Sequence, residues 1–323
     1  QDSPRQAIPK PLDMLRQRAA RCAGMKGRRR AQRGECKPRL HPNGVCLGGR
    51  DPRLSKVGTM TTTTHTVPVL AGPAPRIKKI EIDRPWSWLS SGWADLRKSP
   101  GVSITYGLFF AIVGFLLLGA LWFLNWFYIV LPLSAGFMLM GPLVAVGLYE
   151  ISRRLENGET PTLRHAFTSI FRNTSQILLI GVALMIFLLA WIRLATLIFA
   201  LFFSFRPPSL DNFVAEVFFQ PESVPFLIVG VGTGAVLAAL VFAISAVSIP
   251  MLLDKPQVNV VTAIAASVQS VRLNPAPMLI WAAMIVLFAA GGLVAGYVGL
   301  AVTMPIIGHA TWHAYKDLIS FED

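Results

Sequence analysis

Long apolar runs without a charged side chain constrain this sequence more than any other feature. Two of them, residues 102–124 and 126–149, follow each other with only Asn125 between them. About 20 apolar residues cross the hydrocarbon core of a bilayer as a helix. Inside that core the backbone finds no water to bond with, so we expect each run to be helical. The sequence therefore predicts an all-α, polytopic transmembrane bundle.

We expect about six membrane helices, arranged as three hairpin repeats and accompanied by short amphipathic interfacial helices. The predicted spans are residues 102–124, 126–149, 177–203, 224–252, 277–295 and 297–315. The last apolar stretch is too long for one span and short for two, so five spans are the alternative. Glycines within it offer places where the chain can turn.

An internal repeat favours six spans over five. Each unit consists of a membrane helix, an acidic exit and an amphipathic helix, and Glu156 of one unit aligns with Asp254 of the next. The last part of the chain repeats the exit only, so that Glu150 aligns with His313. Three equivalent hairpins would return the C-terminus to the side of the N-terminus.

The distribution of charge predicts which side faces the cytoplasm. The first 59 residues hold 15 of the 30 Lys and Arg and 4 of the 17 Asp and Glu, so the net charge of +13 belongs mainly to this tail. A basic balance confined to a tail does not indicate nucleic-acid binding. The loops 150–176 and 254–275 are basic, whereas 206–222 is acidic. By the positive-inside rule we expect both termini and the basic loops to be cytoplasmic.

Two domains are predicted. Residues 1–75 form a disordered basic tail, because they lack apolar periodicity, and residues 76–320 form an integral membrane helical domain. Met60 resembles an ordinary start, so we interpret residues 1–59 as translated upstream sequence. The alternative is a basic arm that contacts anionic lipid.

A predicted amphipathic helix precedes the first span. Trp86, Leu89, Trp93 and Leu96 share one helical face, and the opposite face is polar. A helix of this kind suits the headgroup layer of a membrane. The alternative is that these side chains pack on the protein's own helices.

His309 and His313 are the most suggestive candidates for a metal or haem site. A spacing of four residues places both imidazoles on one helical face. A third ligand would have to be Glu150, Asp317 or His165. The interpretation that we favour is that both histidines end a helix at the membrane interface, so no cofactor is predicted.

Arg193 and Glu150 are the other candidate functional residues. Arg193 interrupts an apolar run, and a charge at bilayer depth is a functional hypothesis, although its side chain can also reach the headgroups. Glu150 would serve a proton or cation relay if it faced the bundle interior; otherwise it pairs with neighbouring arginines. No phosphate loop, nucleophile elbow or zinc-hydrolase signature is present, so no catalytic residue is predicted.

Five blocks of the sequence resemble a known family. They are PWSWLSSGWADLRKSP, GFMLMGPLVAVGLYEISRRLENGE, AWIRLATLIFALFF, VFAISAVSIPMLLD and GHATWHAYKDL. Together they are similar to an uncharacterised bacterial integral-membrane family, the domain of unknown function DUF2189, over about residues 76–320. The resemblance implies a multi-pass protein of the inner membrane of a Gram-negative bacterium and implies no mechanism.

The function that we expect is that of a non-enzymatic scaffold, assembly factor or accessory subunit of a membrane complex. Its partners would be the lipid bilayer and other membrane-protein subunits, with no nucleic acid. The alternative is a small-solute or ion transporter built from hairpin repeats. In that case Arg193, Glu150, His309 and His313 would line the path.

Overall fold

The computed structural model describes residues 65–66, 75–124, 126, 129–204 and 213–321. All that follows concerns the unit Thr61–Asp323. The predictions for residues 1–59, and for most of the expected tail 1–75, lie outside the described residues.

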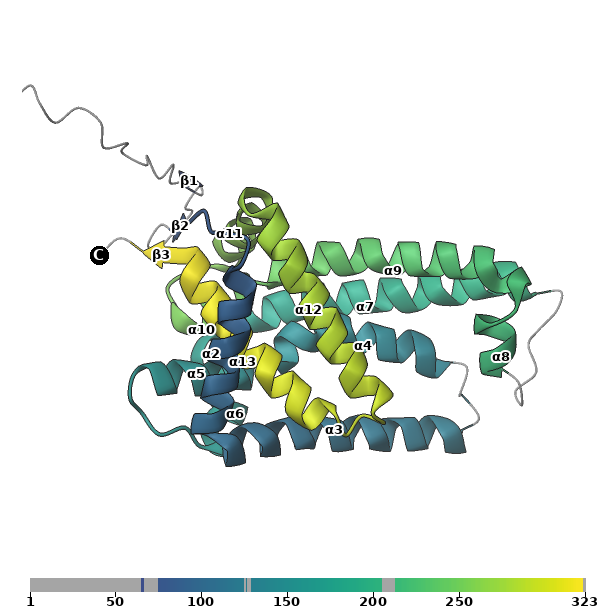
Figure 1. The fold of residues 1–323 in the computed structure, drawn as a ribbon, viewed down its shortest axis with the longest axis horizontal. Helices are drawn as coiled ribbons and strands as arrows, with labels where there is room; N and C mark the ends of the chain where they lie inside the picture. Colours follow the sequence, from purple (N-terminus) through teal and green to yellow (C-terminus); the bar gives the residue numbers. More distant parts are fainter. Residues whose placement is uncertain (1–64, 67–74, 125, 127–128, 205–212, 322–323) are drawn as a thin grey trace, which may run out of the picture. The chain divides into compact units, whose positions relative to one another are not determined.

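Helices make up almost all of the described chain, as Figure 1 shows. In chain order the elements are β1 (His65–Thr66), β2 (Pro75–Ile77), α2 (Arg84–Lys98), α3 (Pro100–Phe123), α4 (Val130–Val144), α5 (Val146–Glu156), α6 (Leu163–Thr168), η2 (Ser169–Asn173), α7 (Thr174–Phe203), α8 (Phe213–Phe218), η3 (Pro221–Ser223), α9 (Val224–Ser245), α10 (Ser248–Asp254), α11 (Val260–Leu273), α12 (Pro275–Val294), α13 (Leu300–Leu318) and β3 (Ile319–Phe321). The predicted all-α polytopic bundle is confirmed.

Five helical segments of the described chain are long and apolar enough to cross a membrane. They are Pro100–Phe123, Pro132–Glu156, Leu163–Phe203, Pro221–Asp254 and Pro275–Val294. The sixth predicted span, 297–315, corresponds to α13, which is not among them because its second half carries polar side chains.

The boundaries of the second span also differ from the prediction. Trp126 lies outside the helical segment, which begins at Val130, breaks at Ala145 and continues beyond Tyr149 as far as Glu156. The helical segment therefore extends beyond the end of the uncharged sequence from which it was predicted. The reason is that the charged side chains after Tyr149 find partners within the protein, as shown below.

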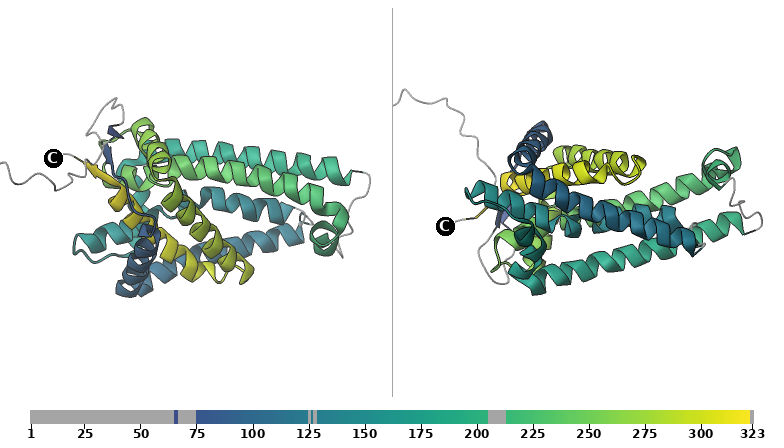
Figure 2. Two further views of the ribbon diagram at one scale, coloured as in Figure 1. Left: turned by 45° about the horizontal axis from the view of Figure 1, so that its top comes forward. Right: turned by 90° about the horizontal axis from the view of Figure 1, so that it is seen from below.

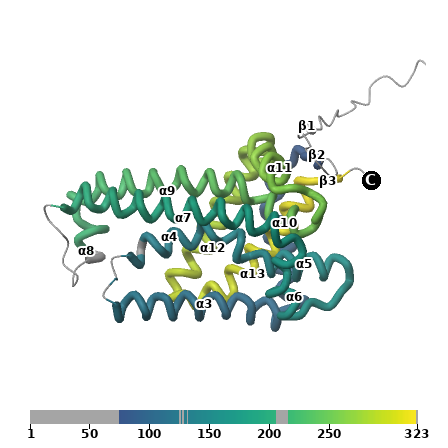
Figure 3. The backbone as a smooth tube through the Cα atoms, turned by 180° about the vertical axis from the view of Figure 1, so that it is seen from behind, coloured from purple at the N-terminus to yellow at the C-terminus, as the bar shows by residue number. Residues whose placement is uncertain are grey.

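The helices of this unit form two layers, and several short helices lie together at one end of them. Figure 1 shows α3, α4, α7 and α9 running side by side, with α12 and α13 as a hairpin across them and α2 across their ends. Figure 2 shows the same arrangement from two further sides. The short helices α5, α6, α10 and α11 gather at one end (Figure 3), which we call the polar end, and α8 lies at the other.

A small antiparallel sheet joins the two ends of the described membrane domain. Its strand order is β1-β2-β3, and Ile77 is in register with Ile319. Beyond β2, the Asn274 side chain accepts from the Ile80 amide at 2.9 Å and donates to the Lys78 carbonyl at 3.0 Å. Because β2 and β3 lie on the same side of the spans, the chain between them crosses an even number of times. The hairpin α12–α13 must therefore cross as a pair or enter and leave on one side.

The predicted repeat is visible in two of its three units. The helix α4 breaks at Ala145 and continues as α5, and α9 breaks after Ser245 and continues as α10. The third unit, α13, contains Pro305 but runs without a break. The two breaks place Glu156 and Asp254, which the repeat aligned, at the polar end.

The tryptophans of α2 differ in their environment: one packs on the protein's own helices, and two remain exposed. Trp88 is buried and meets Trp281 edge-on at 5.7 Å between ring centroids. Trp86 and Trp93 remain 63% and 45% exposed. The buried face also holds Gly92, Asp95 and Leu96, so it differs from the predicted apolar stripe.

Candidate functional site: a polar cluster on the last turns of α13

Close backbone contact brings α13 against α2. A Cβ atom added to Gly92 would lie 2.6 Å from the Ala310 amide nitrogen and 2.7 Å from the Ile306 carbonyl oxygen. Only glycine allows this approach without a shift of the backbone. As a result Asp95, one turn after Gly92, lies beside the histidines of α13.

His309 is the centre of a buried hydrogen-bonded chain. Its Nε2 lies 2.9 Å from Ser103 Oγ on α3, and its Nδ1 lies 2.8 Å from Ser152 Oγ on α5. Ser152 Oγ in turn donates to Asp95 Oδ2 at 2.9 Å. Because the Ser152 proton goes to the carboxylate, Ser152 accepts from Nδ1–H and Ser103 donates to Nε2. This direction of bonding assigns a neutral His309 with its proton on Nδ1.

The opposite end of the chain is Asp95, which is 3% exposed. His313 Nε2 lies 2.8 Å from Asp95 Oδ2, and Lys98 Nζ lies 3.5 Å from Asp95 Oδ1. Burial disfavours the charged form, but hydrogen bonds from His313 and Ser152 outweigh it and hold the pKa of Asp95 below its usual value.

The pKa of His309 is lowered, which agrees with the neutral form that the hydrogen bonds assign. Complete burial lowers it from 6.5 to about 4, against the smaller attraction of the Asp95 charge. Ser103, His309, Ser152 and Asp95 therefore form a buried chain in which Asp95 carries the negative charge, and partly exposed His313 contacts its acidic end.

Further side chains of α13 contact α2 on one side. Asp317 accepts two bonds from Arg84, from Nε at 2.8 Å and from Nη2 at 2.7 Å, and a third from Trp88 Nε1 at 2.9 Å. Burial opposes ionisation, yet these three donors hold the pKa of Asp317 below its usual value. A two-pronged arginine contact of this kind fixes orientation as well as distance.

The same turns contact the repeated acidic exits on the other side. Trp312 Nε1 donates to Glu156 at 3.0 Å, and the Tyr315 hydroxyl donates to Asp254 at 2.8 Å. Lys316 Nζ lies 3.3 Å from Glu156 and 3.9 Å from Asp254. The two acids that the repeat aligned therefore meet at one lysine. Burial, together with the Asp254 charge, raises the pKa of Tyr315.

Glu150 is buried within a group of arginines. It accepts from Arg153 Nε and Nη2 and from Arg154 Nε, each at 2.8 Å, and Arg172 Nε lies 3.8 Å away. Arg154 also donates to Glu159 at 2.7 Å. The described contacts thus match the structural interpretation of Glu150, in which neighbouring arginines balance its charge.

Arg193 lies apart from these groups. It is exposed on α7, roughly 28 Å along the helix from Thr174 at 1.5 Å per residue. The structure therefore brings Glu150, His309 and His313 to the polar end and leaves Arg193 on the outer face of a span.

The histidine pair does not offer a shared set of metal ligands. Both ring nitrogens of His309 face serine hydroxyls, and His313 faces Asp95. Of the third ligands considered, Asp317 is held by Arg84 and Glu150 by arginines. Across the described residues no three His, Cys, Asp or Glu side chains lie close enough to hold a metal ion.

Three members of the chain, Asp95, Ser103 and Ser152, were not predicted from the sequence. Each belongs to a different helix, and the hydrogen-bonded pairs of the chain are separated by 57 to 206 residues in sequence. One local signal was available, since Gly92 and Asp95 lie one turn apart, so that a position open to close helix contact shares a face with a carboxylate.

Comparison with protein families identifies the middle of the membrane domain. Residues 130–254 match the model of a family described as predicted integral membrane protein, DUF2189. The matched segment runs from α4 to α10 and contains the repeated acidic exits, whereas α2, α3 and α13 lie outside the match. The comparisons with curated proteins and with solved structures each found no match.

Proposed function

We propose that this chain is an accessory subunit or assembly factor of a membrane complex, in the inner membrane of a bacterium. The observation that carries the proposal is the large uncovered surface of its spans. Along the apolar stretch of Pro100–Phe123, 22% of the residues are buried, and along that of Pro275–Val294, 28%. Lipid covers such surfaces as readily as a partner helix does, so the open glycines on them are what favour a partner.

Small residues on these surfaces support a helix partner. A Cβ atom added to Gly119, Gly230, Gly232 or Gly291 would meet no other atom within 4 Å. Glycine costs helix stability, and in membranes it is favoured where two helices approach closely. By contrast, Gly234 packs within the chain, because a Cβ atom added to it would lie 3.2 Å from the Trp191 ring.

The alternative, a transporter, requires polar groups along a path through the bundle. The residues proposed for such a path do not meet, since Arg193 points outward while Glu150 and His309 are enclosed at the polar end. Among the described side chains, those that are charged gather at the two ends of the spans, with Arg193 as the exception.

The test is whether the native protein purifies with a stoichiometric membrane partner in mild detergent. We expect Gly230→Leu or Gly232→Leu to release that partner, because both positions are open in the chain itself. Gly101→Leu, also at an open position but at the polar end of α3, is the matched control. Size-exclusion chromatography with light scattering measures the complex. A partner-free particle that carries a solute into liposomes would overturn the proposal.

We further propose that the polar end faces the cytoplasm. It holds the basic loop with Arg153, Arg154 and Arg172, whereas the described part of the loop before α9 carries Glu216 and Glu222. The positive-inside rule places the basic loop on the cytoplasmic side.

A further inference from the structure

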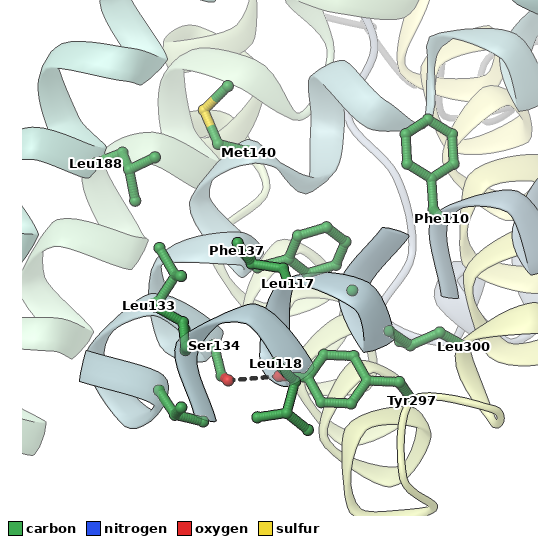
Figure 4. A pocket seen from close by; sticks show the side chains of 13 residues that line it. Phe110, Leu117, Leu118, Leu133, Ser134, Phe137, Met140, Leu188, Tyr297 and Leu300 are labelled. Carbon is green, nitrogen blue, oxygen red and sulfur yellow. Dashed lines mark hydrogen bonds between the residues drawn. The ribbon is translucent and has the colours of Figure 1, made fainter. Parts of the chain in front are cut away.

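A cavity of about 140 Å³ lies between α3, α4, α7 and the turn that joins α12 to α13 (Figure 4). Leucine, phenylalanine and methionine form most of its wall, and its polar side chains are Ser134 and Tyr297. Cavities of roughly this size with such walls stay dry and take a benzene-sized group. There is room for one ring or a short length of hydrocarbon chain.

The two hydroxyls of the wall leave one proton available. Ser134 Oγ and Tyr297 OH are 2.7 Å apart, and one of them donates to the other. Each hydroxyl carries a single proton, so the accepting hydroxyl keeps its own. Within the described part of the chain, neither hydroxyl has a second hydrogen-bond partner. An acceptor oxygen on a ligand would satisfy this donor.

The backbone at Tyr297 is held in an unfavourable conformation that aims its ring at this wall. Its φ is 65°, in the left-handed region that a bulky side chain rarely adopts, and it follows Gly296, also at 65°. A Cβ atom on Gly114 would lie 2.9 Å from Tyr297 Cδ1, so the absence of a side chain at Gly114 makes room for the ring. Strained residues of this kind cluster at ligand sites.

Part of the wall belongs to the exposed face of α3, because Leu117, which lines the cavity, is 47% exposed, and α3 is long and apolar enough to cross a membrane. We propose that the cavity binds an apolar, membrane-dissolved molecule through a carbonyl oxygen that accepts the free proton of the Ser134–Tyr297 pair. Two sources share this chemistry: the ester end of a lipid acyl chain and a ring ketone dissolved in the bilayer. The site is independent of the partner surface proposed above.

The probe is acetophenone, a single ring with one carbonyl, compared with α-methylstyrene, which has the same shape without the oxygen. The full chain in nanodiscs is dialysed to equilibrium with each compound, and uptake by empty nanodiscs of the same lipid is subtracted. We expect acetophenone to bind about fivefold more tightly than α-methylstyrene, the ratio that one net hydrogen bond supplies.

The double variant Ser134→Ala/Tyr297→Phe removes both hydroxyls and keeps the ring, so it should bind both probes equally. Gly114→Val displaces the ring of Tyr297 and should bind neither. The matched control on the same helix is Gly119→Val, which meets open space and should bind as the parent chain does. Absence of excess binding in the parent chain, an unchanged ratio in the double variant, or unchanged binding in Gly114→Val would overturn the proposal.

Mass spectrometry of molecules extracted from the protein, purified from native membranes, distinguishes the two sources. If an esterified lipid is enriched in the extract of the parent chain relative to that of Gly114→Val, the ligand is a lipid acyl chain. If a ring ketone is enriched instead, the ligand is a ketone dissolved in the bilayer. Identical extracts from the two proteins would contradict a resident ligand in this cavity.

Discussion

Asp95 and His309 are held at the polar end by side chains from four helices. Inside a protein a hydrogen bond is stronger than in water, and a polar group that loses its partner is correspondingly costly. The chain Ser103–His309–Ser152–Asp95 satisfies both ring nitrogens and the buried carboxylate. Removing one member of this chain should therefore lower the stability of the fold, because it leaves the neighbouring buried groups without a partner.

Asp95→Asn tests the charged end of this chain. The amide cannot accept as a carboxylate does from His313, Ser152 and Lys98, so we expect the free energy of unfolding to fall by about 1.5–3 kcal/mol. Asp83→Asn, an exposed change at the start of the same helix, should stay within about 0.5 kcal/mol. Denaturant unfolding in detergent compares the two. Equal losses would contradict a role for the buried carboxylate.

His309 makes stability depend on pH. Folded His309 takes up a proton only near pH 4, whereas in the unfolded chain it does so near 6.5. The unfolded state therefore binds more protons between these values, and stability falls as the pH is lowered from 6.5 toward 4. We expect the melting temperature to drop between about pH 7 and pH 5, and to drop less in His309→Gln. His165→Gln serves as control; an equal pH dependence in His309→Gln would refute the assignment.

At the scale of elements, the amphipathic helices bury small residues and leave larger apolar ones half exposed. The buried residues of α11 are mainly small or polar, including Ala263, Ala266 and Ser267, while the larger apolar Val261 is 57% exposed. In a membrane the lipid is as apolar as a protein core, so an apolar stripe need not face the protein. Small side chains allow the close helix contacts instead. Ser267, for example, accepts from the Val247 amide at 3.2 Å.

Gly92→Ala tests the contact between α2 and α13. The new Cβ would lie 2.6 Å from a backbone nitrogen, so the helices must separate and the Asp95 contacts must lengthen. We expect a loss of about 1–3 kcal/mol in unfolding free energy, as for overpacked sites. Gly101→Ala meets open space and should be neutral or stabilising. A neutral Gly92→Ala would show that this contact is looser than the structure has it.

At the scale of the whole membrane domain, the proposed orientation makes a prediction about labelling. With Cys22, Cys36 and Cys46 replaced by Ser, the protein contains no thiol, and single cysteines can be placed at Thr160 or Glu222, both exposed. A membrane-impermeant maleimide should label Glu222→Cys in intact cells and Thr160→Cys only after permeabilisation. The reverse pattern would place the polar end outside.

The sequence by itself determined the class of protein, most of the spans and the repeated acidic exits. Those features depend on local properties: the length of apolar runs, the absence of charge within them and the recurrence of one pattern. It also singled out the end of α13 through His309 and His313, although the interpretation that it favoured was a helix end at the membrane interface and not a buried hydrogen-bonded chain.

Only the tertiary structure decided what these residues touch. Ser103, Ser152 and Asp95 are ordinary residues in sequence, and they form a chain because α2, α3, α5 and α13 meet at one point. It likewise placed Arg193 on the outside and aligned β2 with β3, which requires an even number of crossings. The physical reason is that hydropathy reports the transfer of a side chain out of water. It does not distinguish burial against lipid from burial against protein.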